Sequence, residues 1–120
     1  MSARILLIDD DEDIRGTLGA VLQSDGYDVL EARNGLHALQ QMLAHPLPDL
    51  ILLDMMMPLM SGYEFLDVQQ GDPRIKNIPV IAITAHARVA EVPGVWKLVR
   101  KPFDLDELNG ALREVLDARV

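Results

Sequence analysis

The chain has 120 residues, which suits one ordinary domain and leaves no room for a second. Apolar residues make up 49% of it and charged residues 25%, a globular rather than a disordered composition. The net charge of −8 argues against direct binding to nucleic acid or an anionic membrane, and the absence of cysteine excludes disulfides and thiol chemistry. No apolar run approaches a membrane span and no leader pattern opens the chain, so we expect a cytoplasmic protein.

The first predicted strand, Arg4–Ile8, runs directly into five consecutive acids. Glu12 and Asp13 suit the acidic first turn of a helix. The first acids of the run, Asp9 and Asp10, follow the carboxyl end of a buried strand. They are therefore candidate ligands for a hard divalent cation.

A helix, an edge strand and a second helix are predicted next. Apolar residues at helical spacing begin at Ile14 and stop before Gly26. The segment Asp28–Ala32 alternates polar and apolar residues, which is typical of a strand at the edge of a sheet. The second helix opens at Asn34-Gly35 and must end before Pro46.

The central predicted strand is the aliphatic run Leu50–Leu53, which ends on Asp54. Four aliphatic residues without polar alternation indicate a strand buried on both faces of a parallel sheet. Asp54 then lies at the carboxyl edge, where open α/β sheets place their ligands. A loop rich in methionine follows, and a third helix is expected from about Gly62 to Gln70.

The remaining elements complete the alternation of strands and helices. A fourth buried strand ends on Thr84, and a fifth, Trp96–Val99, is followed closely by Lys101. The region between these strands has only a brief helical pattern, stopped by Pro93-Gly94. Asp104 is a strong N-cap for the last helix.

This alternation predicts an α/β fold, a five-stranded parallel sheet with helices on both faces and right-handed crossovers. The polar residues that follow four of the strands then share one edge of the sheet. They are Asp9, Asp10, Asp54, Thr84 and Lys101. Independent turns would not place chemically complementary groups at the same end of four strands, so we interpret this edge as the functional site.

Four stretches of the chain resemble the signature motifs of the response-regulator receiver domain of two-component signalling. They are Ile8-Asp9-Asp10-Asp11, Leu53-Asp54-Met55-Met56-Met57-Pro58, Ile83-Thr84-Ala85 and Val99-Arg100-Lys101-Pro102-Phe103. The resemblance covers residues 1–120 as one domain, similar to the single-domain chemotaxis regulators. It implies a flavodoxin-like doubly wound fold with strand order 2-1-3-4-5 and five helices. It also implies that Asp54 accepts a phosphoryl group from a sensor histidine kinase or a phosphotransfer protein.

The resemblance also assigns a metal and its ligands. Asp10 and Asp54 would bind Mg²⁺ directly, Asp9 would act largely through water, and the Met56 carbonyl would complete the protein ligands. Mn²⁺ is the alternative ion. Oxygen ligands and bridging to phosphate both suit Mg²⁺.

Further residues of the same motifs would handle the phosphoryl group and hold the loops. Lys101 would neutralise one phosphoryl oxygen, and Thr84 would donate a hydrogen bond to another. Pro58, Gly62 and Pro102 would be structural, with a cis Lys101-Pro102 peptide.

Two departures from the family pattern bear on signal output. The interval from Thr84 to Lys101 is short by roughly a turn of helix or more, so the helix between these residues is expected to be stunted or irregular. The position usually held by an aromatic switch is Leu98, which lacks a phenol's hydrogen bond and volume. We therefore expect an altered readout.

Met56 and His86 occupy the positions where the family tunes acyl-phosphate hydrolysis. Neither is a carboxylate, and an apolar Met56 cannot orient an attacking water. We therefore expect slow self-dephosphorylation and no turnover of an external substrate.

Three functions can be compared with these residues. The first is a phosphorylated switch or relay acting on an unidentified downstream protein through protein contacts. The second is an interaction module that binds regardless of phosphorylation, which the retained site residues argue against. The third is a phosphatase with an Asp nucleophile, which lacks a second Asp at position 56.

Overall fold

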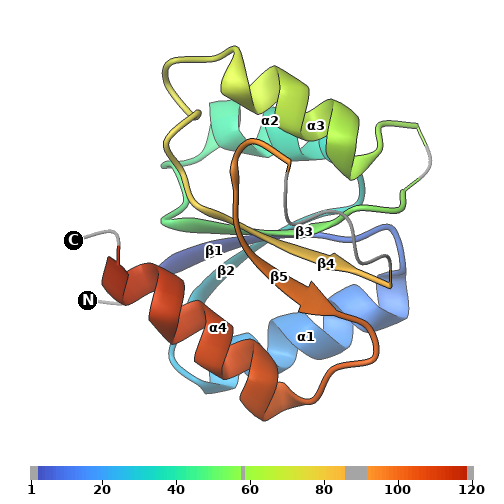
Figure 1. The fold of residues 1–120 in the computed structure, drawn as a ribbon, viewed down its shortest axis with the longest axis vertical. Coiled ribbons are helices and arrows are strands. Elements are labelled where there is room, and N and C mark those ends of the chain that lie inside the picture. Colours follow the sequence, from blue (N-terminus) through green and yellow to red (C-terminus); the bar gives the residue numbers. More distant parts are fainter. Residues whose placement is uncertain (1–2, 58, 86–91, 119–120) are drawn as a thin grey trace.

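We analysed a computed structural model of the chain, which describes residues 3–57, 59–85 and 92–118. Its five strands form one parallel sheet in the order β2-β1-β3-β4-β5 (Figure 1). The elements in chain order are β1 (Arg4–Ile8), α1 (Glu12–Ser24), β2 (Asp28–Ala32), α2 (Gly35–Ala44), β3 (Leu50–Asp54), α3 (Gly62–Gln70), β4 (Val80–Thr84), β5 (Val95–Arg100) and α4 (Leu105–Ala118). The predicted flavodoxin-like strand order is confirmed.

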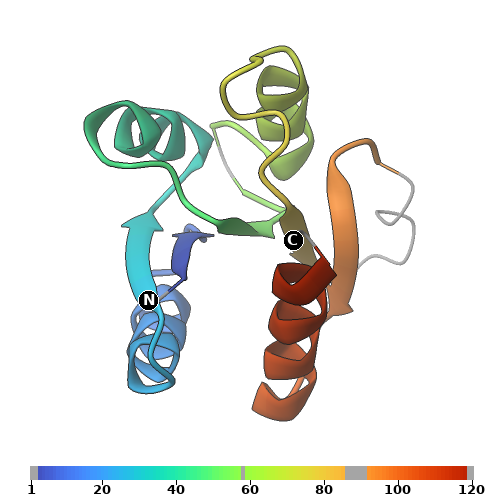
Figure 2. The ribbon, with the colours of Figure 1, turned by 90° about the vertical axis from the view of Figure 1, so that its left-hand side faces the viewer.

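The sheet is the middle of three layers, as the two views in Figures 1 and 2 show. Helices α2 and α3 cover one face, and α1 and α4 cover the other. Successive side chains of β1 alternate between the two cores, with Leu6 and Ile8 under α2 and α3 and with Ile5 and Leu7 on the opposite side. Every residue of β3 is buried, so the prediction of a strand covered on both faces is confirmed.

The helices begin where the sequence places capping side chains. The Asp11 side chain accepts from the first turn of α1, and Asn34 does the same for α2. Ser61 and Glu64 form a capping box at the start of α3. The predicted Asp104 cap of the last helix is also present, since its side chain accepts from Glu107 N–H at 2.7 Å.

The helix count differs from the prediction of five, because the described residues hold four. The short or irregular helix expected between β4 and β5 falls largely on residues 86–91, which lie outside the described residues. Its form therefore stays a prediction. The predicted edge position of Asp28–Ala32 is confirmed, since β2 pairs only with β1.

Candidate phosphoryl-acceptor site at the carboxyl edge

Neighbouring strands bring three carboxylates together at one edge of the sheet. β1 pairs with β3 so that Ile8 lies opposite Leu53, and each strand runs next into an aspartate. Carboxylate oxygens of Asp9, Asp10 and Asp54 all lie within 4.8 Å of one another. This cluster is the acidic site that the strand ends predict, and its oxygens are the ligand type that Mg²⁺ and Mn²⁺ take.

Two of the three carboxylates are buried. Asp9 is 2% exposed and Asp54 is 4% exposed, whereas Asp10 is exposed. Each buried carboxylate accepts one hydrogen bond from the backbone. Met56 N–H donates to Asp54 Oδ1 at 3.1 Å, and Asp11 N–H donates to Asp9 Oδ1 at 2.9 Å. Each buried aspartate is therefore held in one orientation by the loop that follows it.

Burial also dominates the electrostatics of the site. It raises the pKa of Asp54 to about 6, although the Met56 N–H bond and the Lys101 charge oppose the shift and the charges of Asp9 and Asp10 add to it. The pKa of Asp9 is raised as well, first by burial and despite its hydrogen bond from Asp11 N–H. The charged forms of both groups are thus poorly compensated by the protein, which is the environment in which a bound cation is most favourable.

A cation of the chain itself stands beside the central carboxylate. Lys101 Nζ lies 3.9 Å from Asp54 Oδ2, at the limit of an ion pair. Lys101 N–H donates to the carbonyl of Thr84 at 2.9 Å, which ties the end of β5 to the end of β4. The Lys101-Pro102 peptide is cis, as the resemblance implies. Thr84 is 1% exposed at the last position of β4.

The loop after β3 is closed by close backbone contacts. Met55 N–H donates to Ile83 O at 3.2 Å, and Gly62 N–H donates to Met55 O at 3.2 Å. A Cβ at position 62 would lie 2.7 Å from the Met55 Cα, so a side chain there would force the backbone apart. Gly62 therefore permits the loop that carries Met56 N–H to Asp54. Pro58 lies outside the described residues.

The two atypical positions have different surroundings. Met56 is 58% exposed, unlike its buried neighbours Met55 and Met57. Leu98 is half-buried and packs against the core under α2 and α3. His86 lies outside the described residues. The Met56 side chain is therefore open to solvent two residues after Asp54, whereas the Leu98 side chain contributes to the core.

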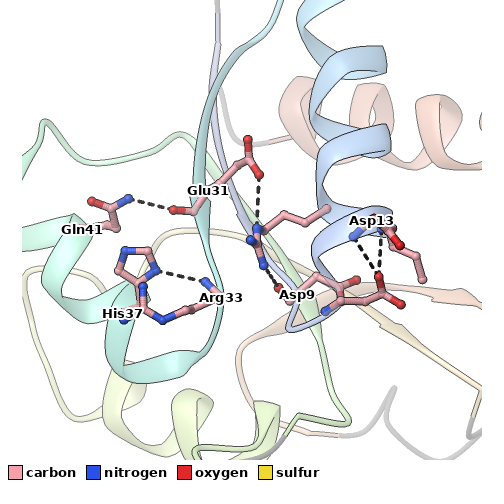
Figure 3. A network of polar contacts seen from close by, with 9 residues as sticks. Asp9, Asp13, Glu31, Arg33, His37 and Gln41 are labelled. Carbon is pink, nitrogen blue, oxygen red and sulfur yellow. Dashed lines mark hydrogen bonds and ion pairs between the residues drawn. The ribbon is translucent and has the colours of Figure 1, made fainter.

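Sequence reasoning missed Arg15. Its guanidinium donates to the carbonyl of Asp9 at 2.7 Å and pairs with Glu31 of β2 at 3.2 Å (Figure 3). The residue thus holds the backbone of Asp9 against the edge strand. Its signal was weak, since one arginine in a helix that starts in an acidic run also suits a surface ion pair.

These residues combine a hard-oxygen cluster, a buried carboxylate and a lysine within one small region. Such an arrangement suits attack by a carboxylate on a phosphoryl group, because the charge that develops there can be neutralised from two sides. Of the residues predicted for the site, Asp9, Asp10, Asp54 and Lys101 are joined by contacts or short distances.

The family model and similar sequences point to the same protein family. The family model described as the response regulator receiver domain matches residues 5–113. Sporulation initiation phosphotransferase F of Bacillus subtilis is 37% identical, with 97% of this chain and 95% of that protein covered. Response regulator MprA of Mycobacterium tuberculosis is 36% identical over 97% of this chain, which spans only 51% of MprA.

Solved structures agree with the sequence relatives. The chemotaxis protein CheY4 of Vibrio cholerae has a TM-score of 0.87 and 28% identity, with 96% of this chain and 99% of that chain covered. A putative response regulator from Chloroflexus aurantiacus also has a TM-score of 0.87, with 30% identity over 98% of this chain and 99% of that one. The chain therefore belongs to the response regulator receiver domain family.

Proposed function

We propose that the chain is a signalling receiver that takes a phosphoryl group onto Asp54 from a phosphohistidine of a sensor histidine kinase or a phosphotransfer protein. The observation that carries the proposal is the Asp9, Asp10 and Asp54 cluster with the Lys101 ammonium 3.9 Å from Asp54. Family membership supports it, as does the similarity to sporulation initiation phosphotransferase F of Bacillus subtilis.

The reaction is a single displacement at phosphorus. A carboxylate oxygen of Asp54 forms a bond to phosphorus, the bond from phosphorus to the imidazole nitrogen of the donor breaks, and its electron pair stays on that nitrogen. The product is an acyl phosphate on Asp54. The Met56 N–H holds the Asp54 Oδ1 oxygen, which leaves Oδ2, the oxygen nearer to Lys101, as the nucleophile.

The donor set fits a divalent cation. The buried aspartates have raised pKa values, so the anionic site gains most from a hard cation held by Asp10 and Asp54, with Asp9 through water and the Met56 carbonyl as the remaining protein contacts. When bound, Mg²⁺ would neutralise phosphoryl oxygens and reduce repulsion between the anionic donor and the site. Lys101 would neutralise another oxygen, and Thr84 would donate a hydrogen bond to a third.

The decisive test is mass spectrometry of the intact protein after incubation with phosphoramidate or acetyl phosphate, with and without Mg²⁺. We expect one phosphoryl addition that requires Mg²⁺ and is absent from Asp54→Asn. Asp117→Asn is a matched control, because it removes the same charge from the exposed end of α4. No addition to a folded, Mg²⁺-binding protein would instead favour an interaction module that acts without phosphorylation.

The acyl phosphate should be long-lived. Met56 lies two residues after Asp54, and its exposed side chain has no group that orients water for in-line attack. We expect a half-life of many minutes after the phosphodonor is removed, measured by loss of the mass addition. Met56→Glu should shorten the lifetime several-fold, and a wild-type half-life of seconds would contradict the expectation.

Output would pass to an unidentified partner through protein contacts. Leu98 already packs against the core and cannot form the hydrogen bond of a phenol, so we propose a readout that does not depend on an aromatic swing at this position. Partner binding compared between wild type and Asp54→Asn would show whether the output depends on phosphorylation.

A further inference from the structure

Helix α2 exposes an apolar seam that the phosphoryl site does not use. Leu36 is 51% exposed and Leu43 is 77% exposed, while Leu39 between them is half-buried. The three leucines are spaced by three and four residues, which is the a-d-a spacing of helices that pack knobs into holes. We call Leu36, Leu39 and Leu43 the α2 seam. α2 and α3 form the outer layer on that side of the sheet (Figure 1).

Two sides of α2 already contact the rest of the chain. Ala38 and Met42 are buried against the sheet, and Gln41 Nε2 donates to the Glu31 carbonyl of the neighbouring edge strand at 2.8 Å. Figure 3 shows Gln41 and Glu31 on that flank. Leu39 packs against the core with its inner side, so it helps to hold α2 in place. Leu36 and Leu43 are the exposed ends of the seam, on a flank that neither the sheet nor β2 covers.

The seam also lies in the longest part of the chain without formal charge. Residues 34–48 contain no Asp, Glu, Lys or Arg, although the chain carries a net charge of −8. By contrast, the exposed Leu105 stands between Asp104 and Asp106. Two copies of so acidic a chain repel one another across most surfaces, and an uncharged apolar seam is where they can approach with least repulsion.

The seam is complementary to itself in an antiparallel pair. A two-fold axis between Leu39 and Gln40 places Leu36 of one copy opposite Leu43 of the other, and the reverse. A two-fold interface requires this kind of self-complementarity, because each copy presents the same patch. The seam offers no charged side chain with which a charged partner could form an ion pair. We propose that the α2 seam is the contact through which two copies of this chain form an antiparallel homodimer.

The dimer should be weak. A contact made mainly by one short helix buries less than the roughly 800 Å² per partner of a standard interface, so we expect a dissociation constant on the order of 100 µM. Added salt should strengthen it, because screening reduces repulsion between the acidic copies. The phosphoryl site does not include the seam, so the dimer leaves Asp54 available.

Sedimentation velocity of the full chain across a range of concentrations tests the proposal. We expect wild type to shift from monomer to dimer as concentration rises, and Leu43→Glu to raise the dissociation constant at least tenfold. Leu105→Glu is the matched control, because it adds the same charge at an exposed leucine of α4 and should leave the equilibrium unchanged. A wild type that stays monomeric, or a dimer that survives Leu43→Glu, would overturn the proposal.

Cross-linking tests the same contact without a substitution that disrupts the interface. The chain has no cysteine, so Gln40→Cys carries a single exposed thiol next to the proposed axis. Packed helix axes lie about 8–10 Å apart, so a short bismaleimide should join two copies efficiently. Ala20→Cys on the exposed side of α1 should yield little product. Equal yields from the two variants would show random collision and count against the seam.

Discussion

The chain places acids of the same chemistry in two contrasting environments. Asp11 is exposed, and its carboxylate accepts from Asp13 N–H at 3.0 Å and Ile14 N–H at 3.1 Å at the start of α1. Asp54 is 4% exposed, and burial raises its pKa to about 6. The exposed acid stabilises the fold by capping a helix, whereas the buried one costs stability when it is charged. A carboxylate that is buried although burial disfavours its charged form indicates a functional site rather than a stabilising contact.

The largest effect should come from removing the buried charge. Without divalent metal, the Asp54 carboxyl binds its proton more tightly in the folded state, with a pKa of about 6, than in the unfolded state, near 3.8. Stability is therefore lost as pH rises through this window. Asp54→Asn should be more stable than wild type by up to about 3 kcal/mol at pH 7, with the difference vanishing below about pH 4.

Urea unfolding in EDTA at several pH values measures this difference. Asp9→Asn should shift stability in the same direction, because burial also raises the pKa of Asp9. Asp117→Asn controls for the change in net charge. A destabilised Asp54→Asn at neutral pH would mean that the carboxylate is better compensated than the structure indicates, and the contrast with Asp11 would fail.

Divalent metal should reverse the cost of the buried acids. A ligand that binds only the folded state stabilises it by about 2.7 kcal/mol when present at 100 times its dissociation constant. We expect Mg²⁺ to raise the melting temperature of wild type at pH 7.5 and to have much less effect on Asp54→Asn. Calorimetric scans with Mg²⁺ titrated against EDTA give this comparison, and equal shifts in both proteins would place the ion elsewhere.

Removing the exposed cap should have the smallest effect and the opposite sign. Asp11→Ala leaves Asp13 N–H and Ile14 N–H without their side-chain acceptor, so it should lower stability by about 1 kcal/mol. Mg²⁺ binding should persist, because the Asp11 backbone N–H that contacts Asp9 remains. Chemical denaturation and a Mg²⁺ titration of the same variant separate the two roles. A loss of both would show that Asp11 belongs functionally to the site.

The contrast between Asp11 and Asp54 was only partly visible in the sequence. Aliphatic runs ending at Ile8 and Leu53 identified the strands, and the acids that follow them were placed at one edge, because parallel strands end together. The run of five consecutive acids at residues 9–13 does not by itself show which of them are buried. Asp9 is buried and Asp10 beside it is exposed, a difference that depends on which way each side chain points after the strand ends.

The least predictable features are contacts between elements distant in sequence. Arg15 binds the Asp9 carbonyl and Glu31 because α1 folds back over β1 and β2. The exposure of Leu36 and Leu43 is another example: with Leu39 they match the spacing of a core-facing stripe, yet only Leu39 packs against the core, beside Ala38 and Met42. Spacing along a helix shows which residues share a face, but the neighbouring elements decide which face is covered.

Within the described residues, then, the sequence determined the strands, their order through the family resemblance, the Asp104 cap and the gathering of Asp9, Asp10, Asp54 and Lys101 at one edge of the sheet. These follow from local hydrophobic periodicity, capping chemistry and the alternation of elements. The tertiary structure decided the burial of Asp9 and Asp54, the 3.9 Å approach of Lys101 to Asp54 and the orientation of α2. Each of these depends on packing between segments far apart in the chain, and no local pattern of residues encodes that packing.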